Sequence, residues 1–302
     1  MKLKVYIGLF WVVLLASCET IIEYELPESE TKLVMNTVFN QDSVWVVQLS
    51  ESKNILDTGN LKKVSGAIVN LSDNQGNTEL LIHQGNGVYK STLGTVPQLG
   101  VEYIVTAEKP GFEAIEASGN LPSPVAIIDI DTTPSLRDGY NFYDTRVRFK
   151  DPAGERNYYS LEVYFTQQLT LQYDSIIQSI QESYPLYYFS EESEFTDNLV
   201  YTFDAIYFSD DLFDGQTYQL KVNVERPYLY EEPPFFIVNS AQIDYRLKSI
   251  SEELYLYERS RTEQSFSSFD PFAQPAQVFS NIENGFGIFA GYSTDTYSIV
   301  LK

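Results

Sequence analysis

Short runs of apolar and β-branched residues, separated by turn sequences, recur through most of the chain and constrain its fold more than any other feature. Residues 33–39 and 44–49 are two such runs, joined by Asn40-Gln41-Asp42-Ser43, and Asp73-Asn74-Gln75-Gly76-Asn77 is a strong turn signal further on. Alternating runs of this length between turn residues are typical of β-strands. Their spacing predicts an all-β fold in which residues 32–121 form an immunoglobulin-like sandwich.

A second region follows a stiff junction at Pro122-Ser123-Pro124, which predicts a domain boundary. Residues 125–302 again contain strand patterns, and they predict a second β-sandwich or partial barrel. One helix is expected near residues 241–261, packed against these strands, because apolar side chains recur there at steps of three and four. Those side chains are Ile243, Leu247, Ile250, Leu254 and Tyr257.

The start of the chain has the pattern of an export signal. Two lysines precede an apolar run at residues 5–16, which is too short to span a bilayer. The run ends in Leu15-Ala16-Ser17-Cys18, the pattern that lipoprotein signal peptidase cleaves. We therefore expect residues 1–17 to be a signal peptide and Cys18 to carry diacylglycerol on its thiol and an acyl chain such as palmitate on its amine. An uncleaved anchor and an ordinary secretory signal are the alternatives.

The composition of the chain that would remain after cleavage limits both its fold and its partners. Residues 18–31 are acidic and contain a proline, so they predict a tether. The formal charge of -22 becomes -24 once the two lysines of the leader are removed, which argues against nucleic acid as a partner. Cys18 is the only cysteine, so no disulfide can form within the chain and the core alone must hold the fold. The 23 Tyr and 19 Phe supply large side chains for that core.

Four stretches together carry a family resemblance. They are Lys32-Leu33-Val34-Met35-Asn36, Asp151-Pro152-Ala153-Gly154-Glu155-Arg156-Asn157-Tyr158-Tyr159, Phe208-Ser209-Asp210-Asp211-Leu212-Phe213-Asp214-Gly215 and the run from Val278 to Tyr292. The chain resembles the Bacteroidota lipoproteins catalogued as domain of unknown function 4249, over essentially the whole mature chain. The resemblance implies an outer-membrane lipoprotein, often encoded beside a TonB-dependent transporter, in a family without an established activity. The acidic stretch after Cys18 is similar to a surface-export signal, which implies display on the outer face of the membrane more than toward the periplasm.

The last of these motifs also has a physical interpretation. Between Asn281 and Tyr292, glycine alternates with bulky apolar residues. Glycines in this pattern predict that two backbones approach closely, or that a strand bends.

Most catalytic devices are excluded because their residues are missing. His83 is the only histidine, and the chain has no Gly-x-Ser-x-Gly elbow, phosphate-binding loop or dinucleotide fingerprint. We therefore predict a protein that is not an enzyme and needs no cofactor. A glycosidase that uses a pair of carboxylates stays open, because the chain contains 42 acidic residues.

One acidic segment is a weak candidate for calcium. Asp210, Asp211 and Asp214 precede Gly215, and carboxylate oxygens are the ligands that calcium prefers. Their spacing differs from that of an EF-hand loop, and Asp-Gly before a strand is a common hairpin turn. The turn is the favoured interpretation, so no metal site is predicted.

Aromatic residues cluster in three segments that are expected to be loops, at residues 184–189, 227–236 and 266–272. Rings on loops above a rigid sandwich can hold a sugar or peptide, or can dock onto a membrane protein. They can equally fold back and seal the ends of the sandwich. The candidate contact residues are Tyr187, Tyr188, Tyr228, Tyr230, Phe235, Phe236 and Phe269.

These observations and the resemblance lead to one functional prediction. We expect a non-enzymatic lipoprotein, anchored in the outer membrane, that serves as an accessory or ligand-capture subunit of a TonB-dependent β-barrel transporter. Its ligand would be an oligosaccharide, a peptide or another small nutrient. A surface glycosidase and a structural or adhesive spacer are the two alternatives.

Overall fold

The computed structural model describes residues 30–54, 57, 59–173, 176–191, 200–202, 205–267, 274 and 276–302. The chain divides into the units Met1–Glu30 and Thr31–Lys302, and the structure described below lies in the second. The leader, Cys18 and Phe269 lie outside the described residues. The described part is almost entirely β-structure with one helix, which confirms the predicted all-β fold class. None of its helical structure is long and apolar enough to cross a bilayer.

Seven strands form the N-terminal half of the described unit. They are β1 (Leu33–Phe39), β2 (Val46–Glu51), β3 (Ile68–Asp73), β4 (Thr78–Gly85), β5 (Val88–Lys90), β6 (Glu102–Glu108) and β7 (Ile115–Asn120). Their hydrogen-bonded order is β1-β2-β5-β4-β3-β6-β7. Alternate side chains turn inward, and Met35, Trp45 and Val47 are almost completely buried between the strands.

The C-terminal half contributes the longer elements. They are β8 (Ile127–Arg137), β9 (Tyr140–Lys150), β10 (Tyr158–Tyr173), β11 (Ile176–Pro185), β12 (Tyr188–Phe189), β13 (Val200–Tyr201), β14 (Ile206–Ser209), β15 (Thr217–Glu225), β16 (Phe236–Ile250), α2 (Glu252–Ser267) and β17 (Phe286–Val300). A four-stranded sheet, β12-β15-β9-β8, packs against β10 and β16 over a second core. Phe149, Phe165 and Tyr245 are among its fully buried side chains.

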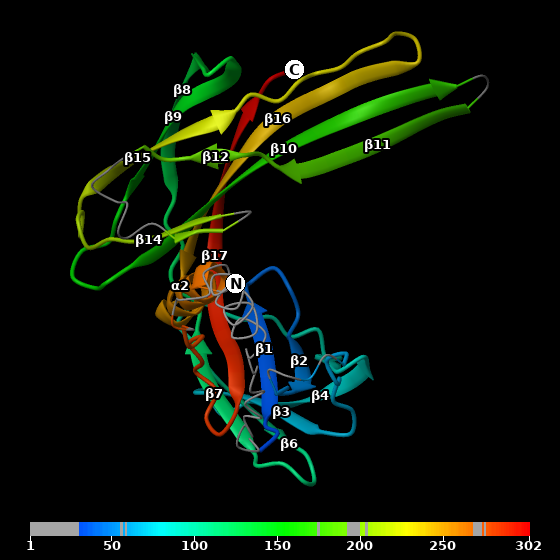
Figure 1. The fold of residues 1–302 in the computed structure, drawn as a ribbon, viewed down its shortest axis with the longest axis vertical. Helices are drawn as coiled ribbons and strands as arrows, with labels where there is room; N and C mark the ends of the chain where they lie inside the picture. Colours follow the sequence, from blue (N-terminus) through cyan, green and yellow to red (C-terminus); the bar gives the residue numbers. More distant parts are fainter. Residues whose placement is uncertain are drawn as a thin grey trace, which may run out of the picture. The chain divides into compact units, whose positions relative to one another are not determined.

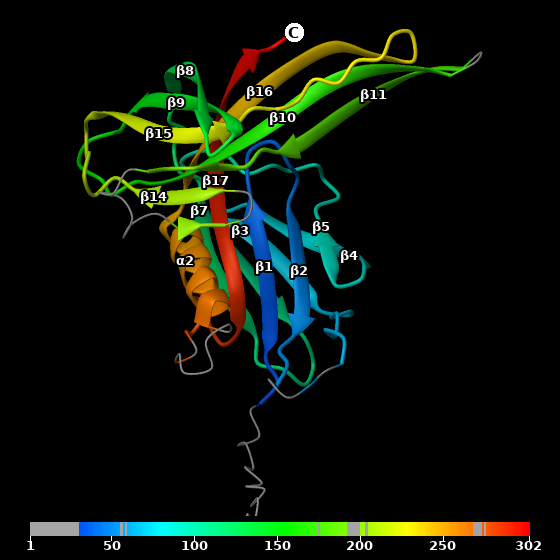
Figure 2. The same cartoon turned by 45° about the horizontal axis from the view of Figure 1, so that its top comes forward.

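Strand β17 links the two halves, as Figure 2 shows. Its first part pairs in parallel with β1, from Val34 opposite Phe286 to Phe39 opposite Gly291, and its second part pairs antiparallel with β16. Phe289 of β17 is completely buried in the N-terminal core. The junction at residues 122–124 lies between β7 and β8, where the chain passes from one core to the other, and the division into two domains stays a prediction.

The close backbone approach expected from the glycine-rich motif occurs along β17. A Cβ atom on Gly287 would lie 1.9 Å from the carbonyl oxygen of Met35, and Gly287 has a φ of +114°. A Cβ atom on Gly291 would lie 2.3 Å from the carbonyl oxygen of Asn120. Only glycine fits at these two positions without moving the neighbouring strand.

The helix lies later in the chain than predicted. Residues 241–250 belong to β16, and α2 covers Glu252–Ser267, so the expected bounds of 241–261 are wrong for their first half. Ile243 and Leu247 are four residues apart, a step that fits both a helix and the core face of a strand. This segment forms a strand because it pairs with β10 on one side and with β17 on the other. The helix then starts after Ser251, whose side-chain oxygen accepts a hydrogen bond from the Leu254 amide.

Candidate functional site

Three of the candidate aromatic residues are exposed on the segment that connects β15 to β16. The exposed fractions are 81% for Tyr228, 49% for Tyr230 and 55% for Phe235. The segment is held against β16 because the carboxylate of Glu231 accepts a hydrogen bond from the amide of Val238 at 3.1 Å. These rings therefore face solvent on a segment that is fixed at its base.

The same segment meets the end of the β10–β11 hairpin. Gln172 of β10 donates its backbone amide to the carbonyl of Phe235 at 2.9 Å, and on its other side Gln172 pairs with Ile177 of β11. Ile176 and Ile177 are 67% and 70% exposed. Strands β10, β11 and β16 run side by side toward this end in both views (Figures 1 and 2). We call Ile176, Ile177, Tyr228, Tyr230 and Phe235 the sheet-end surface.

The other candidate rings are arranged differently. Tyr188 is buried in the second core, where its hydroxyl donates to the carbonyl of Leu161. Phe236 is half-buried, with its ring centroid 5.7 Å from that of Tyr230. Tyr187 is exposed between β11 and β12, and its ring lies 5.9 Å from that of Phe189. Two of the predicted contact residues thus pack on the body, as expected for rings that seal a sandwich.

The segment 184–189 is also less of a loop than its composition indicates. Tyr184 and Pro185 are the last two residues of β11, where Tyr184 pairs with Phe165. Proline is tolerated there because it ends a strand whose outer edge needs no amide donor.

Two residues of the acidic segment, Asp210 and Asp214, form a cluster with Asp151, which no sequence pattern had linked to them. One carboxylate oxygen from each of Asp151, Asp210 and Asp214 lies within 4.8 Å of the others, whereas Asp211 turns away and pairs with Arg156 at 2.6 Å. Asp151 comes from the Asp-Pro-Ala-Gly turn after β9, 59 residues before Asp210, so only the fold brings them together.

The oxygens of this cluster already accept hydrogen bonds that hold turns. Asp151 accepts from the amide of Gly215 at 2.8 Å, Asp210 accepts from the amide of Asn157 at 2.8 Å, and Asp214 accepts from the amide of Gly154 at 3.0 Å. Burial raises the pKa of Asp210, and its acidic neighbours act in the same direction. This arrangement is that of a structural turn, but not of the hairpin expected from the Asp-Gly sequence, because β14 and β15 belong to different sheets and do not pair.

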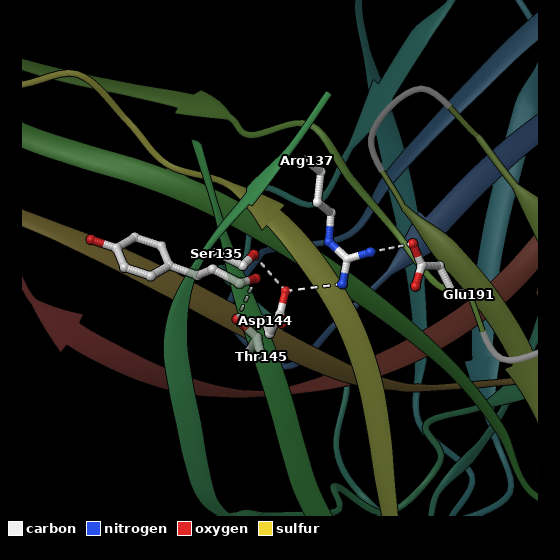
Figure 3. Close-up of polar contacts among 6 residues, drawn as sticks. Ser135, Arg137, Asp144, Thr145 and Glu191 are labelled. Carbon is white, nitrogen blue, oxygen red and sulfur yellow. Dashed lines mark hydrogen bonds and ion pairs between the residues drawn. The ribbon is translucent and has the colours of Figure 1, made fainter. Parts of the chain in front are cut away.

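A second polar cluster ties the β8–β9 hairpin to the segment after β12 (Figure 3). Arg137 donates to Asp144 at 3.2 Å and to Glu191, and Ser135 donates to the same oxygen of Asp144 at 2.6 Å. These contacts lower the pKa of Asp144, the hydrogen bond from Ser135 most of all. No sequence motif marks this cluster, because Glu191 lies 54 residues from Arg137.

Two further carboxylates line a shallow depression of about 290 Å³ on the β8–β9–β15 sheet. Asp129 pairs with Arg148, and Asp131 pairs with Arg146 at 3.0 Å. Each carboxylate is thus the acceptor of an ion pair with an arginine, so neither oxygen pair is left facing a second carboxylate alone.

Comparison with known proteins places the chain in a family. No curated protein matches it. The family model described as Domain of unknown function (DUF4249) matches residues 19–298 of the 302, which confirms the resemblance found in the sequence motifs. The chain therefore belongs to the DUF4249 family.

Proposed function

We propose that this protein is a non-enzymatic, lipid-anchored accessory subunit of an outer-membrane TonB-dependent transporter. In this proposal, Cys18 carries the lipid, the body is displayed on the outer face of the membrane, and the sheet-end surface contacts the barrel. The observation that carries the proposal is the exposure of five apolar side chains at one end of the long β10–β11–β16 sheet.

The chemistry of these side chains supports a protein contact. Covering aromatic and isoleucine side chains with a partner removes apolar surface from water and stabilises the complex. Buried aromatic rings commonly contribute most of the binding free energy of an interface. Three of the five side chains are on the segment that Glu231 holds against β16 by its hydrogen bond to Val238. The backbone of this segment therefore loses little conformational entropy on binding. Exposed apolar side chains that gather on neighbouring segments of an otherwise acidic protein are typical of an interaction surface.

The polar clusters support the non-enzymatic part of the proposal. In the part of the chain that the structure describes, the carboxylates of Asp129, Asp131 and Asp211 are paired with arginines, and those of Asp151 and Asp210 accept backbone hydrogen bonds. These groups hold the fold together.

Co-purification from mildly solubilised outer membranes tests the proposal. The lipidated, tagged chain is expected to bring down a stoichiometric TonB-dependent barrel. A variant with Tyr228, Tyr230 and Phe235 replaced by Ser should recover roughly tenfold less barrel, because the lost contacts are apolar. The control replaces Tyr140 and Leu136, each 69% exposed at the β8–β9 hairpin, by Ser, and it should recover as much barrel as the unmodified chain.

Two outcomes contradict the proposal. Recovery of the tagged chain alone, under conditions that keep other receptor complexes intact, would exclude the accessory role. Equal recovery of the barrel by the sheet-end variant and by the control would leave the partner in place but would show that the contact lies elsewhere.

A further inference from the structure

A cavity of about 390 Å³ lies at one end of the N-terminal sandwich. Its walls are the β3–β4 turn and the connection between β5 and β6, and Trp45 and Tyr103 form part of its lining with their ring centroids 4.6 Å apart. A volume of this size accommodates a small molecule, and the lining combines apolar side chains such as Leu71, Leu93 and Val96 with polar groups that can orient a ligand.

A carboxylate occupies a core-facing position in this cavity. On β4, Glu79 is buried and follows the same alternation as Leu81, and in the paired strand it lies directly opposite Leu71. Both leucines belong to the N-terminal core. The strand pattern calls for an apolar residue at position 79, and a buried acid there is a local conflict of the kind that often marks a functional site.

Glu79 is only half satisfied by the protein. One carboxylate oxygen accepts a hydrogen bond from the hydroxyl of Thr95, which in turn lies 3.1 Å from the hydroxyl of Ser91. The other oxygen, Oε1, is buried and has no hydrogen-bond partner among the described residues, and the residue as a whole is 9% exposed. A buried acceptor without a donor is unfavourable, and more so when it is charged.

A second acid makes the cavity negative. Asp73 also lines it and accepts hydrogen bonds from the amide of Asn77 at 2.8 Å and from the side-chain amide of Asn77 at 2.7 Å. These bonds, the side-chain one first, lower the pKa of Asp73 below its ordinary value, so the group is ionised at neutral pH. Among the described residues that line the cavity, none is Lys, Arg or His.

We propose that this cavity binds a small organic cation whose primary ammonium group pairs with the carboxylate of Glu79. An ammonium supplies the donor that Glu79 lacks and balances the charge of the two acids. Its alkyl part would lie against Trp45 and Tyr103. The ammonium group would in addition be attracted to the faces of these rings. The site shares no residue with the sheet-end surface, so its test does not depend on a transporter.

Tryptophan fluorescence provides a direct readout. The chain contains two tryptophans, Trp11 and Trp45, and Trp45 lines the cavity. In the full chain with Trp11→Phe, Trp45 is the only tryptophan, and excitation at the red edge of the absorption band selects its emission over that of the tyrosines. Butylamine and putrescine are titrated as probes, with butanediol and succinate as the neutral and anionic counterparts of putrescine. We expect a saturable change in emission with the two amines.

Two variants test the role assigned to Glu79. Glu79→Gln keeps the shape of the side chain and removes its charge, and Leu93→Arg places a cation on a 73% exposed residue of the lining without touching a buried group. Each should weaken amine binding roughly tenfold or more. Glu102→Gln, which removes the same charge from an exposed position on β6, is the matched control and should bind amines unchanged.

Each outcome decides the proposal. Saturable amine binding that Glu79→Gln and Leu93→Arg weaken, while Glu102→Gln does not, supports it. Equal binding of butanediol or succinate, the absence of amine binding, or unchanged binding in the variants overturns it. If Glu79→Gln fails to fold, as judged by its melting temperature, Leu93→Arg alone decides, since the exposed position tolerates the substitution.

Discussion

The hydroxyl of Tyr245 lies 3.3 Å from the hydroxyl of Thr145, which joins β16 and β9 across the second core. Tyr245 is fully buried, and this contact is the polar link between two otherwise apolar sheet faces at that point. A buried phenol in such a place must stay neutral, because the protein offers no cation to balance a phenolate there among the contacts described.

Alkaline unfolding follows from this burial. Desolvation raises the pKa of Tyr245 to about 12 from an ordinary value of 10.0, and the pKa values of Tyr158 and Tyr159 are raised as well. The unfolded chain ionises first, so stability is complete below pH 10 and is lost as the pH rises through the folded pKa. The loss from Tyr245 alone amounts to roughly 3 kcal/mol. Circular dichroism against pH measures the unfolding, and the part of the phenolate absorbance that comes from the buried tyrosines should appear in the same transition.

The variant Tyr245→Phe separates this effect from the hydrogen bond. At neutral pH we expect it to be less stable by about 1 kcal/mol, because the hydrogen bond between Tyr245 and Thr145 is lost. Above pH 10 the difference in free energy of unfolding between the two proteins should narrow or change sign, since phenylalanine cannot ionise. A constant difference between the two proteins across this range would show that Tyr245 does not titrate with unfolding.

The close contact between β17 and β1 predicts a large effect at one glycine. Gly287→Ala would place a methyl group against the carbonyl oxygen of Met35 at a φ that alanine rarely adopts, so we expect a loss of roughly 3 kcal/mol or more. Gly111→Ala is the matched control: its φ is +89°, but nothing lies within 4 Å of the added atom. It should cost only about 1 kcal/mol. Urea unfolding of the three proteins measures both, and equal losses would refute the steric argument.

The turn cluster predicts a pH-dependent difference. Burial raises the pKa of Asp210, so its ionised form destabilises the fold at neutral pH, and the unmodified protein regains this stability as the pH falls through the folded pKa. Asp210→Asn has no such charge and can still accept the hydrogen bond of Asn157. The stability of the variant relative to the unmodified protein should therefore be greatest at neutral pH and shrink on acidification. A difference independent of pH would contradict this.

The ion pairs of Figure 3 should contribute little. Arg137 is about one-third exposed and Asp144 and Glu191 are more exposed, so solvent screens both pairs. Arg137→Met should lower the free energy of unfolding only slightly, and added salt should reduce the difference further. Thermal melts at low and high salt measure this, and a large, salt-insensitive loss would mean that packing of the arginine chain matters more than its charge.

The sequence allowed the strands to be predicted better than the site. Alternation and turn residues placed the first two strands, predicted at 33–39 and 44–49, within two residues of their bounds, because period two is a local property. At residues 243–247 the same apolar spacing fits a helix or a strand, and the choice depends on β10 and β17, which lie far away in the chain. The meeting of Asp151 with Asp210 and the burial of Glu79 depend likewise on packing, so no local pattern could reveal them.

The parallel pairing of β1 with β17 also fixes an order of events. Phe39 and Phe289, with ring centroids 4.7 Å apart, are separated by 250 positions in the sequence, so the first sheet lacks a strand until the last residues of the chain arrive. Contacts between such distant residues form late, because closing the loop between them costs entropy before any contact is gained. A chain truncated after β7 would leave β1 with an open edge, ready to pair with another molecule. Strand β17, which is synthesised late, thus closes the open edge of β1, which is synthesised early.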